Sequence, residues 1–315
     1  MPFFWNQPQL SWGVELSTDQ MYVVGLRDTS AQPQWCHQFC ITAPNAFQSP
    51  EHLNNPMAMG KSLAQVLRGL NVRQGECTFA LPGVELATLH RGAPKSSETM
   101  WQVVQNHLQQ VAEPEQTWAF DFAITDELCT VAFCPQSLVN DYLLLASYTP
   151  LHVSALEPDS SATERALRVY WPHCLQDSVL LIVLTPRGSL WQVFSEQALV
   201  YQQSMPWRVS PEALRYSGWL NVQPDLAAGV QSLIQKLGDV AHFRVLLAGV
   251  WADQPELQTL LSEYWHQPPQ VLDLNAVLGV PALTPIATES DTQSHAAQFL
   301  VALGLALRGC RHVTV

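Results

Sequence analysis

The side chains best suited to chemistry are the cysteines and histidines of Cys36-His37-x-x-Cys40 and of His173-Cys174. Thiolates and imidazoles are zinc ligands, and a thiol beside an imidazole can act as a nucleophile with its base. No second Cys/His cluster in the sequence completes four metal ligands, and on a strand His37 lies opposite Cys36 and Cys40. Residues adjacent in sequence, such as His173 and Cys174, rarely form a catalytic pair. We therefore expect reduced core thiols, no metal site and no catalytic residues here.

The composition restricts the classes of function further. The 315 residues are 47% hydrophobic and only 13% charged, with a net charge of −12, which excludes global disorder and disfavours binding to nucleic acid or anionic lipid. No apolar run is long enough to span a bilayer, and the start of the chain lacks the regions of a signal peptide. Hydrolase, P-loop and dinucleotide-binding motifs are missing. With seven scattered cysteines, the chain is expected to be cytoplasmic.

The hydrophobic pattern predicts an α/β fold with an internal duplication. Strands are expected at 12–17, 21–26 and 35–41, a helix at 62–70 and a strand at 78–83. The same order returns in the second half, with strands at 178–184, 189–194 and 198–202, helices at 211–219 and 225–237, and a strand at 243–248. Between the halves, residues 87–150 predict a helix, two strands and a helix, followed by a strand at 152–156 and a helix at 160–170. A helix at 254–264, a strand at 270–274 and a final helix at 294–308 complete the chain. Such a repeat predicts two facing lobes separated by a cleft.

This order resembles the actin-like superfamily, and several motifs resemble its PilM branch of type IV pilus assembly proteins. The motifs are Phe79-Ala-Leu-Pro-Gly83, Leu89-His-Arg-Gly-Ala-Pro94, Phe120-Asp-Phe122, Leu151-His-Val-Ser-Ala-Leu156 and Ala302-Leu-Gly-Leu-Ala-Leu-Arg308. The last is similar to the closing signature of PilM-like chains. The sequence resembles the short, divergent members of this family, such as HofM and ComA, more than it resembles full-length PilM.

The resemblance implies an actin-like fold, with ribonuclease H-like duplicated lobes and a small inserted αββα subdomain. The expected divisions are a first lobe at 1–86 completed by 151–172, the insertion at 87–150, a second lobe at 173–293, and a C-terminal helix at 294–315 that returns to the first lobe. It also implies a scaffold peripheral to the inner membrane that binds the N-terminal tail of a PilN- or HofN-like membrane protein. A motor ATPase is a further implied partner, in pilus assembly, competence or DNA uptake.

The tail is expected to lie in a groove between the first lobe and the inserted subdomain. The candidate residues for this groove are His90, Arg91, Trp118, Phe120 and Asp121. Core packing is the competing interpretation for the aromatic side chains among them.

The resemblance also implies two phosphate loops and an adenosine loop, and all three depart from the expected pattern. Leu16 and Val183 stand where a glycine and an aspartate are expected, and Val250-Trp251 follow the single glycine of the adenosine loop. The residues that could still belong to a nucleotide site are Gly13, Glu15, Ser17, Thr18, Thr185, Arg187, Gly188 and Gly249. Loss of a magnesium-positioning carboxylate predicts a pseudo-ATPase without a cofactor. The alternative left open is an ATPase that binds ATP with Mg²⁺, or with Arg187 in place of the metal, or a sugar-kinase-like phosphotransferase.

Overall fold

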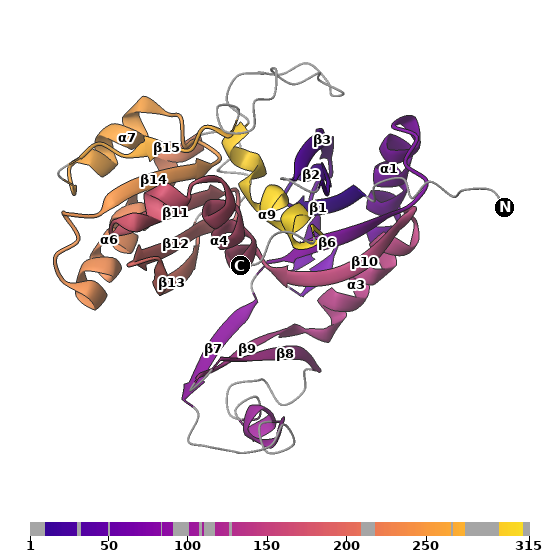
Figure 1. The fold of residues 1–315 in the computed structure, drawn as a ribbon, viewed down its shortest axis with the longest axis horizontal. Helices are drawn as coiled ribbons and strands as arrows, with labels where there is room; N and C mark the ends of the chain where they lie inside the picture. Colours follow the sequence, from indigo (N-terminus) through magenta and orange to yellow (C-terminus); the bar gives the residue numbers. More distant parts are fainter. Residues whose placement is uncertain are drawn as a thin grey trace.

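The computed structural model describes residues 10–29, 33–49, 51–82, 84–90, 101–106, 109, 117–125, 128–208, 218–265, 267–274 and 296–310. They form two α/β lobes with a smaller sheet projecting from the first (Figure 1). Within these residues, no helix is long and apolar enough to cross a bilayer.

The first lobe is built on a five-stranded sheet of order β10-β6-β1-β2-β3. Strands β1 (Leu10–Leu16), β2 (Gln20–Arg27) and β3 (Gln34–Thr42) form an antiparallel meander. Strands β6 (Gly75–Leu81) and β10 (Leu151–Pro158) extend the sheet in parallel beyond β1. Strands β1 and β2 are buried on both faces, as expected for a central sheet covered by helices.

The second lobe repeats this arrangement strand for strand. Its meander is β11 (Val179–Thr185), β12 (Gly188–Ser195) and β13 (Ala198–Pro206). Strands β14 (Arg244–Gly249) and β15 (Gln270–Val271) lie parallel beyond β11, so the order is β13-β12-β11-β14-β15. The predicted duplication is confirmed.

Two helices pack on the outer side of each lobe. In the first lobe α1 (Pro56–Gly69) packs against α3 (Gln136–Ser147), and their apolar faces join the same core as β1 and β6. In the second lobe α6 (Gln223–Leu237) and α7 (Pro255–Ser262) cover β11 and β14, with the 3₁₀ turn η2 (Gly218–Val222) before α6. Most of the predicted helix at 211–219 lies outside the described residues.

Helix α1 begins earlier than the predicted residue 62. The side chain of Asn55 accepts a hydrogen bond from the amide of Ala58 at 3.1 Å, and Pro56 occupies the first helical turn. This Asn-Pro pair is a helix-start signal that the apolar periodicity alone misses.

Two further helices, α4 (Asp159–Tyr170) and α9 (Leu300–Arg308), lie between the sheets (Figure 1). The 3₁₀ turns η1 (Pro172–Gln176) and η3 (Ala296–Phe299) join the same central core. Helix α9 is buried from Leu300 to Leu307 and packs on β1, β2, β6 and α4. Gln192 of β12 donates to the carbonyl of Ser160 at 3.0 Å, which ties α4 to the second lobe.

The inserted subdomain differs from the predicted αββα unit. Its sheet has three strands in the order β7-β9-β8, namely β7 (Glu85–His90), β8 (Trp118–Thr125) and β9 (Leu128–Pro135), with helical residues 101–106 beside it. Strand β7 was not predicted. Helix α3, the predicted last element of the insertion, instead buries its apolar face in the first-lobe core.

Candidate functional site in the interlobe cleft

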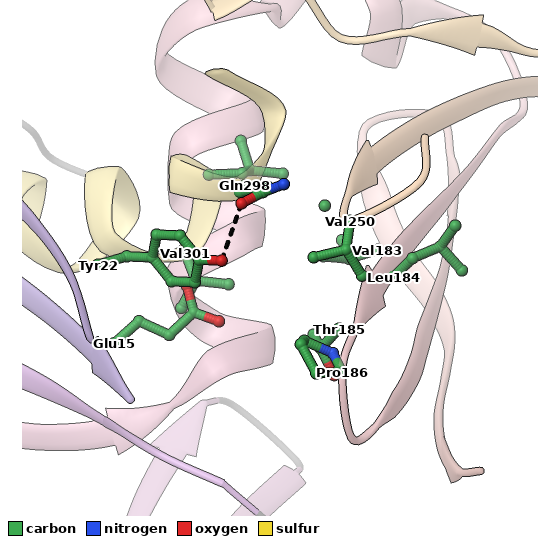
Figure 2. A pocket seen from close by; sticks show the side chains of 11 residues that line it. Glu15, Tyr22, Val183, Leu184, Thr185, Pro186, Val250, Gln298 and Val301 are labelled. Carbon is green, nitrogen blue, oxygen red and sulfur yellow. Dashed lines mark hydrogen bonds between the residues drawn. The ribbon is translucent and has the colours of Figure 1, made fainter. Parts of the chain in front are cut away.

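A narrow pocket lies where β1, β11 and β14 end, between the two lobes. Figure 2 shows Glu15 and Tyr22 of the first lobe facing Thr185 and Pro186 of the second. The Tyr22 hydroxyl donates to Gln298 Oε1 at 2.8 Å and closes one side. The space open to the centre of a water-sized sphere is about 10 Å³, which is about what one water molecule requires. This pocket by itself does not hold a nucleotide.

Glu15 is the acidic group of the pocket. It is 8% exposed, and within the described part of the chain its Oε2 atom has no hydrogen-bond partner. Burial, with a smaller contribution from Asp159, raises the pKa of Glu15 to about 8, against the lowering effect of Arg187. In the metal-free protein Glu15 is therefore mainly protonated at neutral pH, and a metal ion would have to displace this proton in order to bind.

This shift predicts a specific pH dependence of stability. Since the pKa of Glu15 is about 8 in the folded protein and 4.5 when unperturbed, the folded state binds more protons between these values. The free energy of unfolding should then fall as the pH rises from 4.5 to 8, with a limiting slope of about 1.4 kcal/mol per pH unit. Urea unfolding across this range should show a shallower fall for Glu15→Gln. Equal slopes for Glu15→Gln and the wild type would contradict the assignment.

Arg187 is the basic group of the cleft, and it extends from the β11–β12 turn toward the first lobe. Its guanidinium carbon lies 4.3 Å from the centroid of the Phe47 ring, a cation–π geometry. Burial lowers the pKa of Arg187, while Tyr142, Asp159 and Glu15 oppose this shift. Burial likewise raises the pKa of Asp159, and Arg187 opposes that change. Arg187, Asp159, Tyr142 and Glu15 therefore lie close enough to influence one another's ionisation.

Several amides of the three predicted loops already donate to protein acceptors. The amide of Ser17 donates to the carbonyl of Gln20 at 2.8 Å, and the amide of Val250 to that of Leu184 at 2.8 Å. The amides of Arg187 and Gly188 both donate to Thr185 Oγ1, at 3.3 and 3.2 Å. Phosphate loops rely on free amides, whereas these are engaged within the chain.

The three glycines of the predicted nucleotide site stand where a side chain would clash with backbone or where the backbone conformation favours glycine. A Cβ on Gly13 would lie 1.9 Å from the carbonyl oxygen of Ala302 in α9, so Gly13 serves helix packing rather than the pocket. A Cβ on Gly188 would lie 2.3 Å from the Met205 carbonyl oxygen. Gly249 has a φ of +89° and lines the pocket.

Ser17 and Thr18 stand at the β1–β2 turn, as predicted. Their hydroxyl oxygens are buried and have no hydrogen-bond partner among the described residues. Val250 of the adenosine loop lines the pocket, and both Val250 and Trp251 pack against the second-lobe core. Val183, which replaces the expected aspartate, also lines the pocket.

The predicted partner-binding residues are spread along the subdomain sheet. By register, Trp118 pairs with Pro135 at one end of β9 and His90 with Leu128 at the other; Arg91 lies outside the described residues. Trp118 and Phe120 pack on the subdomain's own core, which agrees with the packing interpretation. Asp121 is exposed on the opposite face of β8. Ala119 shares that face and packs against the first-lobe core.

The sequence analysis missed Phe47, Tyr142 and Asp159. Asp159 had a usable signal, because it is an acidic residue in the first turn of a helix that follows a parallel strand. Phe47 and Tyr142 had none, since their proximity to Arg187 depends on how the lobes pack.

Side chains of both cysteine and histidine motifs pack within the fold. The ring of His37 stacks on Trp12 with centroids 5.5 Å apart, and Cys174 is buried in the central core. Among the described residues, no three His, Cys, Asp or Glu side chains gather as a metal site would require.

Two duplicated lobes around a cleft, each with an antiparallel meander and two parallel strands, define an actin-like fold. The fold matches a solved protein from Bacteroides thetaiotaomicron described as having an actin-like ATPase fold (TM-score 0.53, 10% identity, 88% of this chain and 95% of that chain). A PilM-PilN type IV pilus biogenesis complex contains a more similar chain, with a TM-score of 0.74 at 18% identity over 95% of this chain and 98% of that one. The ethanolamine utilization protein EutJ from Carboxydothermus hydrogenoformans gives 0.55 at 13% identity, over 98% and 91%.

The predicted resemblance to PilM is thus confirmed at the level of the fold. No family model and no curated protein sequence matches the chain.

Proposed function

We propose that this protein is a non-catalytic scaffold of a type IV pilus or DNA-uptake machine. It binds the N-terminal tail of a PilN-like inner-membrane protein and is held at the cytoplasmic side of that membrane by this partner. The observation that carries the proposal is the similarity to the chain of the PilM-PilN complex, which extends over almost the full length of both chains.

The cleft supports a role without nucleotide turnover. Glu15 is mainly protonated at neutral pH, and Val183 occupies the position where a second carboxylate would be needed to hold magnesium water. Several of the loop amides that would cradle phosphate donate within the chain. ATP and Mg²⁺ are therefore not expected as cofactors.

The alternative is an actin-like ATPase whose nucleotide state gates partner binding. The unpartnered hydroxyl groups of Ser17 and Thr18 favour it, because hydroxyls at such a turn could donate to phosphate. A nucleotide at this pocket would displace the side chains that now line it, because the pocket holds about one water molecule.

The surface near the inserted subdomain suits a peptide partner. Exposed large apolar side chains lie on the outer helices of the first lobe, at Met57 of α1, at Leu143 and Leu144 of α3, and at Tyr148, which follows α3. Asp121 of β8 adds an exposed carboxylate on the sheet face whose Ala119 contacts this lobe. Apolar anchors on the first lobe and an acidic group on the subdomain would complement a tail that carries leucine, tryptophan and arginine.

A labelled synthetic peptide of the PilN-like tail tests the partner assignment. We expect saturable binding, weakened by about five- to tenfold in Asp121→Lys, because a reversed charge would repel an arginine of the tail. Asp253→Lys is the matched control, since Asp253 is equally an exposed aspartate but lies in the second lobe. Absence of binding by the wild type, or equal weakening in the two variants, would contradict the proposal.

A further inference from the structure

Arg187 joins the β11–β12 turn of the second lobe to the segment that follows the meander of the first lobe. It stands in the turn after β11, and Phe47 follows the meander of the first lobe in the short strand β4 (Phe47–Ser49). The amide of Ala46, next to Phe47, donates to the carbonyl of Thr18 at 2.8 Å. The contact therefore connects the second phosphate-type turn with the first, across the cleft.

The turn that carries Arg187 is braced within its own lobe. Thr185 Oγ1 accepts hydrogen bonds from two amides of the turn, a local arrangement typical of Ser/Thr turns. The indole of Trp207 donates to the Thr185 carbonyl at 2.8 Å, and the Trp207 amide donates to the Arg187 carbonyl at 3.1 Å. Because the turn is already fixed, Arg187 loses little conformational entropy when its guanidinium contacts the opposite lobe.

The Phe47 side of the contact is also fixed, by hydrogen bonds and by packing. Strand β4 pairs with β5 (His52–Leu53), and the amide of Leu53 donates to Asp141 of α3 at 2.9 Å. Phe47 packs against the first-lobe core. The ring therefore cannot follow Arg187 if the second lobe moves away, so the contact resists opening of the cleft.

We propose that Arg187 is an internal latch, whose guanidinium on the Phe47 ring keeps the two lobes closed without a bound ligand. A ligand in the cleft of a two-lobed protein can link the lobes by contacting both. Here a side chain of the protein makes this connection. The proposal concerns the conformation of the free protein and does not depend on the identity of the membrane partner.

Hydrogen exchange and small-angle X-ray scattering of the ligand-free protein test the latch. In Arg187→Met, which keeps an unbranched side chain but removes the guanidinium and its charge, amides of residues 46–49, 51–53, 183–185 and 187–188 should exchange about tenfold faster, the effect expected from losing a partly buried cation–π contact. The radius of gyration should increase. Arg187→Lys should restore part of the protection, because an ammonium group also binds an aromatic ring.

The matched control is Arg208→Met, since Arg208 is also in the second lobe and pairs with Asp225 of that lobe, with its side chain 81% exposed. Phe47→Leu should reproduce the loss of protection, and the Arg187→Met/Phe47→Leu double variant should add little to either single change. The proposal is overturned if exchange and radius of gyration in Arg187→Met match those of Arg208→Met. It is also overturned if the two single effects are simply additive.

Discussion

Glu157→Gln should destabilise the protein by about 3–5 kcal/mol, the cost of removing one partner from a buried ion pair. Glu157 of β10 is 3% exposed, and both of its oxygens accept hydrogen bonds from Arg165 of α4. Arg308, at the end of α9, also donates to Glu157. The neutral amide would leave Arg165, whose side chain is 14% exposed, without its counter-charge.

Denaturant unfolding measures this effect, and Glu164→Gln provides the comparison. Glu164 also pairs with an arginine, Arg168, but on a more exposed helix surface, with side chains 23% and 27% exposed. We expect a loss of about 0.5 kcal/mol or less there. Similar losses in the two variants would show that the Glu157 cluster does not hold β10, α4 and α9 together.

Gly304→Ala should lower the free energy of unfolding by about 1–3 kcal/mol or more. A Cβ at this position of α9 would lie 1.8 Å from the carbonyl oxygen of Ala162 in α4. The obstacle is backbone rather than a flexible side chain, so α9 would have to move away from α4. Such a movement would disturb the central core and the bond from Arg165 to the Gly304 carbonyl, which is 2.9 Å long.

Gly69→Ala controls for the intrinsic preference of helices for alanine. Gly69 is the last residue of α1, and a Cβ there meets nothing within 4 Å. This change should leave stability unchanged or raise it by up to about 1 kcal/mol. Thermal unfolding of both variants measures these changes in stability. A Gly304→Ala protein as stable as the wild type would refute the close packing of α4 and α9.

The fold was largely predictable because its elements have strong local signals. Alternating and continuous apolar runs identify β1, β2, β11 and β14, and the repeated order of elements reveals the duplication. The signature around Gly304 and Arg308 now has a physical basis. Gly304 permits the close approach of α9 to α4, and Arg308 binds Glu157.

The remaining features depend on contacts between distant segments, which local patterns do not contain. The amphipathic pattern of α3 predicts a helix but does not say that Tyr142 joins the first-lobe core. Gly13 and Gly188 fitted a phosphate-loop interpretation, whereas their environments show that close backbone approach requires them. The contact of Arg187 with Phe47 depends on the relative position of the lobes.

The most direct measurement for the scaffold proposal is calorimetric titration of the PilN-like tail in nucleotide-free buffer and again with millimolar ATP and Mg²⁺. Linkage requires that a nucleotide which gates tail binding must change its affinity. We predict the same dissociation constant in both buffers, within about twofold, and no heat when ATP is titrated alone. Binding that appears only with ATP, or an affinity that changes by about tenfold or more, would contradict a nucleotide-independent scaffold and favour the gated ATPase.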